Sequence, residues 1–131
     1  MRSLLILSLV LAFASPVAGA DWPQWRGPDF NGSTDEKNLP TDWSQTENVV
    51  WVAEMPGPSA ATPIVSGDHV FVSSADAENE TMQALCFNRR TGKLLWQHEV
   101  TSGLRQDHRS TYSSPSPVTD GKLVVFFYGN G

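Results

Sequence analysis

A stretch of ten residues occurs twice in this chain, and this repeat constrains the fold more than any other feature. Residues 63–72 read PIVSGDHVFV and residues 117–126 read PVTDGKLVVF, so a proline, a β-branched residue, a glycine and a closing apolar run coincide at an offset of 54 residues. In each copy two short β-type runs flank a turn that contains glycine, the pattern of a hairpin. The chain is therefore built from repeated β units.

Short strand-like segments separated by turn residues continue through most of the chain from Asn48 onward, without a useful helical period. Residues 62–100 contain four such segments and are expected to form one full unit of four antiparallel strands. Residues 48–54 are expected to add a strand of a preceding or closing unit, and residues 116–128 the first two strands of the next. Repeated four-stranded units are typical of β-propellers, in which neighbouring blades bury each other's faces. The sequence predicts an all-β chain, the N-terminal fragment of a β-propeller built from four-stranded antiparallel blades, over residues 48–131.

The first 20 residues have the three parts of a secretory signal. Arg2 supplies the positive start, residues 4–13 the apolar core, and Ala18-Gly19-Ala20 the small residues that precede cleavage. The apolar core is too short to span a bilayer. We expect residues 1–20 to be removed and the mature protein to be exported to the periplasm or the outside without an integral membrane segment. Residues 21–47 then form an N-terminal segment rich in tryptophan and proline.

Charge and cysteine content narrow the class of partner. The formal net charge is -5, and about -6 once Arg2 is removed, which disfavours nucleic acid because phosphate binding needs a basic surface. Cys86 is the sole cysteine, so no disulfide can form within the chain. A lone cysteine in an apolar strand is expected to be a small buried hydrophobic residue.

The segment FNRRTGKLLW, residues 87–96, resembles a phosphate loop but lacks its glycine and its serine or threonine: Phe87 and Leu94 occupy those positions. A hairpin turn explains the segment better. Asn88 and Thr91 can bond the turn backbone through their side chains, and Gly92 can adopt a positive φ. Arg89 and Arg90 are then expected to be solvated at the tip of the turn.

Residues 86–96 resemble the A-x-D-x-x-T-G-x-x-x-W signature of the quinoprotein-type propellers, also called pyrroloquinoline quinone (PQQ) repeats. Cys86 stands at the alanine position, Asn88 at the aspartate, Thr91 and Gly92 at the turn, and Trp96 at the docking tryptophan. Residues 21–32, DWPQWRGPDFNG, also resemble the opening of exported PQQ-like propeller proteins of planctomycete type.

The resemblance implies two functional classes. One comprises PQQ-dependent alcohol and sugar dehydrogenases, in which the propeller holds the quinone and calcium and a carboxylate acts as base. The other comprises non-catalytic propellers similar to BamB, which present a surface to protein partners. The residues favour the second class: a binding or scaffold module of the cell envelope, with protein partners and no cofactor in this chain. The alternative is the N-terminal part of a dehydrogenase, with its decisive residues beyond Gly131.

The candidate reactive residues give the enzyme little support. The turn carboxylates Asp76, Glu78 and Glu80 offer oxygen to calcium but lack the spacing of an EF-type loop, so a solvated turn is favoured. The three histidines share no metal-ligand spacing and are expected at ordinary surface or packing positions. They are His69, His98 and His108. A triad of Asp107, His108 and Ser110 is disfavoured, because no nucleophile elbow accompanies it.

The tryptophans divide into two groups. Trp22 and Trp25 could form an aromatic platform for sugar, which makes a carbohydrate-binding module the second alternative, but we expect both rings to pack into the first blade. Packing between blades is expected for Trp43, Trp51 and Trp96. The sequons at Asn31 and Asn79 matter only in a glycosylating host.

Overall fold

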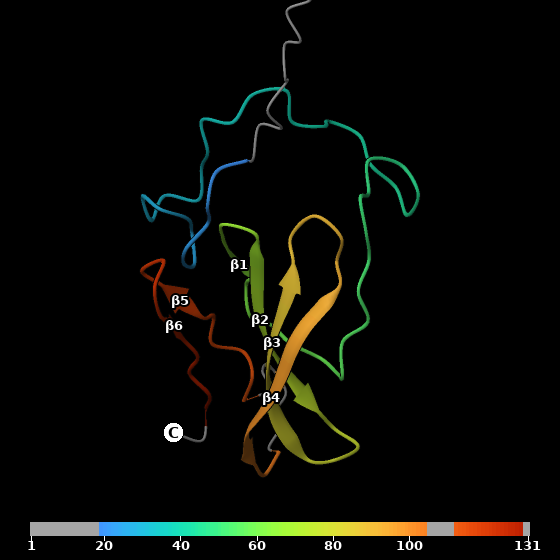
Figure 1. Ribbon diagram of the computed structural model, residues 1–131, viewed down its shortest axis with the longest axis vertical. Helices are drawn as coiled ribbons and strands as arrows, with labels where there is room; N and C mark the ends of the chain where they lie inside the picture. Colours follow the sequence, from blue (N-terminus) through green and yellow to red (C-terminus); the bar gives the residue numbers. More distant parts are fainter. Residues whose placement is uncertain (1–18, 105–111, 130–131) are drawn as a thin grey trace, which may run out of the picture.

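A computed structural model describes residues 19–104 and 112–129 (Figure 1), and this part of the chain contains strands and turns but no helix. Four consecutive strands form one antiparallel sheet in the order β1-β2-β3-β4. They are β1 (Ile64–Ser66), β2 (His69–Asp76), β3 (Thr81–Asn88) and β4 (Leu94–Ser102). A second sheet pairs β5 (Val118–Thr119) with β6 (Val124–Val125). The prediction of an all-β chain with antiparallel four-stranded units is confirmed.

The four strands of the first sheet coincide with the four segments expected within residues 62–100. The prediction of a strand at residues 48–54 is wrong, because this segment forms no ladder with any described strand. Instead it crosses one face of the sheet, where Ala53 and Met55 pack against Val72, Leu85 and Phe87. Its branched and aromatic side chains have high strand propensity, but a segment forms a strand only where a neighbouring strand is placed to pair with it.

Both faces of the inner strands β2 and β3 are covered. Register places Val72 opposite Leu85 on one face, beneath residues 53–55. On the other face, Ala75 lies opposite Met82 and packs with Tyr128, which follows β6. The two inner strands are thus buried between segments that lie far apart in the sequence, as expected for stacked layers.

The segments that lead into β1 and β5 contact each other at equivalent positions. The Ser59 hydroxyl donates to the carbonyl of Ser113 at 3.3 Å, and the amide of Thr62 donates to Oγ of Ser116 at 2.9 Å. In both pairs the separation is 54 residues, the offset of the sequence repeat. When repeats are related by rotation about an axis, the distance between equivalent residues of two neighbouring repeats grows with their distance from that axis. Equivalent residues that touch therefore lie near the axis. These lead-in segments therefore lie on the side of the sheets that faces the axis of the repeat.

Tyr128 carries a buried hydroxyl that has no hydrogen-bond partner among the residues that the structure describes. The residue is 3% exposed, and burial raises the pKa of its phenol to about 12. A buried hydroxyl that loses its bonds to water costs about 1–3 kcal/mol. We therefore expect Tyr128→Phe to raise the free energy of unfolding by about 1 kcal/mol, measured by urea denaturation. The matched variant Tyr112→Phe alters a partly exposed residue and should change it by less than about 0.5 kcal/mol. Destabilisation by Tyr128→Phe would contradict this account.

Candidate functional site

The turn between β3 and β4 is organised by the side chain of Asn88. Its Oδ1 atom accepts hydrogen bonds from the amides of Arg90 and Thr91 and from the Thr91 hydroxyl, each at 3.0 Å. The amide of Gly92 donates to the carbonyl of Asn88 at 2.9 Å, and Gly92 has a φ of 69°. The Thr91 hydroxyl in turn accepts from the amide of Lys93 at 3.3 Å. The amide of Asn88 therefore closes this turn as an aspartate carboxylate can.

Trp51 packs directly on this turn, a pairing that the sequence interpretation missed. A Cβ atom added to Gly92 would lie 2.6 Å from Cδ2 of the Trp51 ring. The indole Nε1 donates to the carbonyl of Arg89 at 2.8 Å, and the ring stacks on Phe87 with a centroid separation of 6.4 Å. Gly92 is thus required both for its positive φ and for the close approach of an aromatic ring.

Trp96 lies between the two sheets rather than on the turn beside it. Its ring is 6.0 Å from that of Phe71 and meets Phe126 edge-on at 6.2 Å. Phe71 belongs to the first sheet and Phe126 follows β6. Trp96 therefore joins successive sheets by aromatic contacts, the packing that was expected for it.

Cys86 lies fully buried in β3, opposite Trp96 in the register of the sheet. Burial raises the pKa of its thiol to about 11. Because the thiolate is the reactive form of cysteine, this thiol is a poor nucleophile and a poor metal ligand.

Asp76 caps the turn between β2 and β3 with its carboxylate. The carboxylate accepts from the side-chain amide of Asn79 at 2.9 Å and from the amides of Glu78 and Asn79 at 3.1 and 3.0 Å. The side-chain bond from Asn79 is the main reason that the pKa of Asp76 is lowered. Its oxygens are thus used by the turn itself. Within residues 19–104 and 112–129, no three His, Cys, Asp or Glu side chains are grouped to hold a metal ion.

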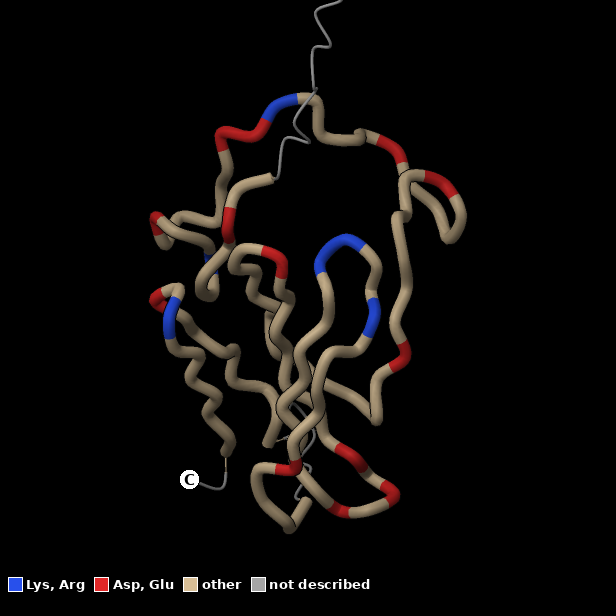
Figure 2. Tube along the Cα trace, viewed as in Figure 1, with Lys and Arg blue, Asp and Glu red and all other residues tan. Residues whose placement is uncertain are grey.

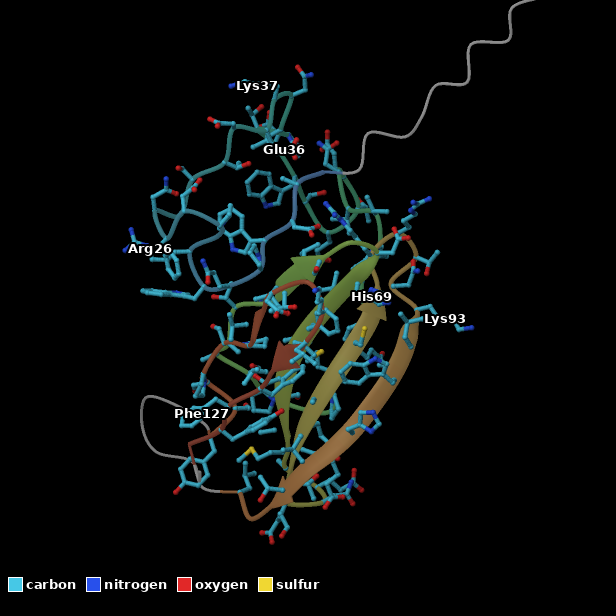
Figure 3. All side chains as sticks on the ribbon, turned by 60° about the vertical axis from the view of Figure 1, so that its left-hand side comes forward. Arg26, Glu36, Lys37, His69, Lys93 and Phe127 are labelled. Atoms are coloured by element: carbon cyan, nitrogen blue, oxygen red, sulfur yellow. The ribbon has the colours of Figure 1, made fainter. Side chains whose placement is uncertain are left out.

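The histidines are separated in the structure. His69 begins β2 and stacks on Phe71 at 5.8 Å, whereas His98 lies on β4 with its ring 5.0 Å from that of Trp96. Both are exposed, and Figure 3 shows His69 at the end of the sheet that also carries Lys93. The candidate triad of Asp107, His108 and Ser110 lies outside the described residues.

Arg89 corrects the expectation of two solvated arginines. Its side chain is 24% exposed, lies 3.7 Å from the carboxylate of Asp21, and donates to the carbonyls of Gly67 at 3.3 Å and Gly19 at 2.7 Å. Arg90 does face solvent: it is 64% exposed and lies 3.3 Å from Asp68. The N-terminal segment is expected from the sequence to pack on the first blade, but the sequence does not identify Asp21 as the partner of Arg89.

Charges gather at opposite ends of the first sheet (Figure 2). The turn between β3 and β4 carries the cations Arg89, Arg90 and Lys93, and the turn between β2 and β3 carries acidic residues. The overall negative charge is therefore unevenly spread, which gives the two ends different electrostatic character.

The N-terminal tryptophans do not behave alike. Trp22 is partly buried and folds onto Gly27, where an added Cβ atom would lie 2.7 Å from the ring. Trp25 is 60% exposed, with the guanidinium of Arg26 at 5.6 Å from its ring centre, so the expectation that both rings pack into the first blade is wrong for Trp25. Trp43 is 70% exposed and does not pack between the described sheets, which corrects the prediction made for it. Burial of these rings depends on covering segments, which local sequence does not specify.

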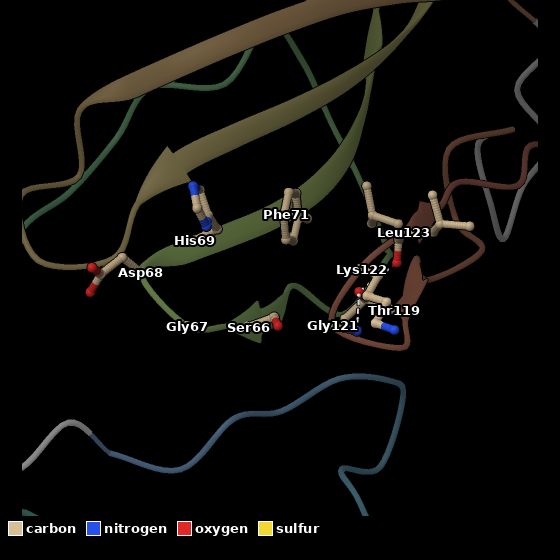
Figure 4. Close-up of a pocket in the computed structure, with 10 residues that line it drawn as sticks. Ser66, Gly67, Asp68, His69, Phe71, Thr119, Gly121, Lys122 and Leu123 are labelled. Atoms are coloured by element: carbon tan, nitrogen blue, oxygen red, sulfur yellow. Dashed lines mark hydrogen bonds between the residues drawn. The ribbon is translucent and has the colours of Figure 1, made fainter.

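A cleft of about 420 Å³ separates the turn between β1 and β2 from the hairpin of β5 and β6 (Figure 4). Its walls mix charged and apolar side chains, including Asp68, His69, Phe71, Lys122 and Leu123. On these walls the carboxylate of Asp68 pairs with Arg90, and the hydroxyl of Ser66 donates to the carboxylate of Asp21 at 3.5 Å.

Two described surfaces expose apolar side chains. Strand β4, at the edge of the first sheet, exposes Leu94, Leu95 and Val100. The β5–β6 hairpin region exposes Val118, Leu123, Val125 and Phe127, and Figure 3 places Phe127 beyond the end of β6. Exposed apolar side chains gathered on one element are candidates for contact with another protein.

A four-stranded antiparallel meander that is followed by the same hairpin again, with tryptophans packed on a turn and between sheets, defines a β-propeller repeat protein. Residues 33–131 match the family model described as outer membrane protein assembly factor BamB, and the chain belongs to this PQQ-repeat family. No curated protein and no solved structure matches the chain. In the part of the chain that the structure describes, no helix has the length and hydropathy needed to cross a membrane.

Proposed function

We propose that this protein is an exported, non-catalytic propeller-repeat module that presents a binding surface to protein partners at the cell envelope. The family match carries the proposal, because it spans residues 33–131 and so includes both sheets and both exposed apolar surfaces. The family description names an outer membrane assembly factor. Such a role needs a stable surface and no reactive centre.

The polar side chains at two turns of the first sheet stabilise those turns. Asn88 accepts three hydrogen bonds within its turn, and Asp76 accepts three within its own. Cys86 is buried with a raised pKa. A general base needs a free acceptor near a reacting atom. Side chains whose acceptors are already used by their own turns serve the fold instead.

Strand β4 is the surface that best fits a protein partner. It runs for nine residues, from Leu94 to Ser102, and pairs only with β3 among the described strands. Over residues 94–100 its other edge therefore has no partner strand within the described part of the chain, and it lies beside the exposed side chains of Leu94, Leu95 and Val100. An edge of this kind can accept an extended segment of another protein.

A site-specific photo-cross-linker tests this proposal in the producing cells. We expect a cross-linker at Leu95, on the edge strand, to give one discrete protein adduct. A cross-linker at Leu39, a leucine that is more exposed than Leu95 but lies in the N-terminal segment, should give none. The same protein, recovered from the envelope, should begin at Asp21 on N-terminal sequencing. Absence of any adduct at Leu95, or a cytoplasmic protein that retains residues 1–20, would contradict the proposal.

The dehydrogenase alternative is tested by activity. We expect the whole protein, incubated with PQQ and calcium, to give no dye-linked oxidation of a panel of alcohols and sugars above the rate of the cofactor alone. The physical reason is that a productive site needs a polarising cation and a positioned base, and the described candidates serve turns. Turnover that requires both PQQ and calcium would establish the dehydrogenase.

A further inference from the structure

The segment of residues 21–23, called the strap below, is hydrogen-bonded to both sheets at equivalent positions. Trp22 exchanges two backbone hydrogen bonds of 2.9 Å with Val65 in β1. The carbonyl of the next residue, Pro23, accepts from the amide of Thr119 in β5 at 2.9 Å. Val65 and Thr119 coincide in the sequence repeat. Adjacent residues of the strap therefore bind the same position in two successive repeats.

Asp21 anchors the strap electrostatically. One carboxylate oxygen accepts from the amide of Gly67 at 2.9 Å and lies 3.7 Å from the guanidinium of Arg89, and the other accepts from the hydroxyl of Ser66 at 3.5 Å. Hydrogen bonds that involve an ionised group are stronger than neutral ones. The anchor therefore ties the strap to the turn between β1 and β2 and to the turn between β3 and β4.

The strap occupies the edge of each sheet that faces the axis of the repeat. Strand β1 is an edge strand of its sheet: none of the described strands pairs with its outer edge, and Trp22 of the strap forms an antiparallel bridge to Val65 there. The lead-in segments of β1 and β5 touch through Ser59 and Ser113, which places the starts of both strands near the axis. Figure 4 shows the N-terminal segment running past β1 and the β5–β6 hairpin.

We propose that the axis-facing edges of β1 and β5 form a binding site for an extended polypeptide segment, and that residues 21–23 are its occupant. Unpaired strand edges recruit extended segments through backbone hydrogen bonds, with side-chain contacts adding selectivity. Here the backbone bonds come from Trp22 and Pro23 and the selectivity from Asp21. While the strap is bound, the backbone groups of Val65 and Thr119 that it occupies are closed to other strands. The site is separate from the outer edge of β4.

Hydrogen exchange in the whole chain tests the occupancy. The amides of Val65 and Thr119 donate to strap carbonyls, so both should exchange slowly in the parent protein. Asp21→Ala should accelerate exchange at both amides by at least about tenfold, since one charged hydrogen bond contributes a free energy of that order. Asp29→Ala removes an exposed carboxylate further along the same segment and should leave both rates unchanged. Rates at Val65 and Thr119 that do not respond to Asp21→Ala would overturn the proposal.

Binding in trans tests the site itself. A chain that begins at Ser33 should bind a synthetic peptide of residues 21–32, and the peptide with Asp21→Ala should bind at least about tenfold more weakly. The whole chain should not bind the peptide, because its own strap fills the site. Slow hydrogen exchange of the β2 and β3 amides would show that the shortened chain is folded. If it is folded and does not bind the peptide, the proposal is wrong; if it is unfolded, the exchange experiment on the whole chain decides.

Discussion

Gly92→Ala should lower the free energy of unfolding by about 3 kcal/mol, measured by urea denaturation. The new methyl group would lie 2.6 Å from the ring of Trp51, and the residue would keep a φ of 69° that L side chains disfavour. Overpacking typically costs about 1–3 kcal/mol, and the left-handed conformation adds about 1 kcal/mol. The clash with Trp51 and the unfavourable φ both arise from the same added Cβ atom.

Gly121→Ala is the matched control for Gly92→Ala. Gly121 also has a positive φ, of 87°, but nothing lies within 4 Å of an added Cβ atom, so only the conformational cost of about 1 kcal/mol is expected. In a protein that already carries Trp51→Ala, adding Gly92→Ala should lower the free energy of unfolding by only about 1 kcal/mol, as for Gly121→Ala, because the clash with the ring is gone. Equal effects of Gly92→Ala and Gly121→Ala in the parent would show that Trp51 does not pack on this turn.

Gly57→Ala should be at least as damaging, by about 3 kcal/mol or more, for a different reason. An added Cβ atom would lie 2.1 Å from the backbone carbonyl oxygen of Ala75. Ala75 is paired with Met82 between the two inner strands of the sheet, so its backbone cannot move aside without disturbing the ladder. A contact with backbone is relieved less easily than one with a flexible side chain.

Ser74→Ala separates this clash from the loss of a hydrogen bond. The Ser74 hydroxyl donates to the carbonyl of Gly57 at 2.9 Å, so the variant removes a bond at the same junction without adding volume. Its expected cost is about 1 kcal/mol. If Gly57→Ala cost no more than Ser74→Ala in urea denaturation, the close approach of Gly57 to β2 would be refuted.

The strands and turns of the first sheet could be predicted because their signals are local. Alternation within residues 69–76 and the turn chemistry of Asn88, Thr91 and Gly92 act over a few residues, and the structure forms strands and a turn there. Residues 48–54 have equally strong strand propensity yet cross a sheet face, because pairing depends on a free neighbouring edge. Propensity indicates which segments can extend, and topology decides what they pair with.

The contacts that join distant segments could not be predicted. Arg89 appeared to be a solvated turn residue because its partner, Asp21, belongs to a segment with no strand pattern. The contact of Trp51 with Gly92 likewise needs the path of residues 48–54 across the sheet. The cleft beside His69 was missed for the same reason, since its walls come from two repeats. Long-range placement follows from packing, and one sequence carries little information about it.

The contacts of Ser59 with Ser113 and of Thr62 with Ser116 bear on how such a chain can evolve. Each bond joins a side chain of one repeat to the backbone of the other, at equivalent positions. A duplication of one whole repeat would copy the hydroxyl and the backbone group together, so a new junction would inherit its hydrogen bonds ready made. Gain or loss of a whole repeat should then destabilise the protein less than gain or loss of part of a repeat. The inner lead-in segments thus make the repeat, rather than the single residue, the unit by which this architecture can lengthen or shorten.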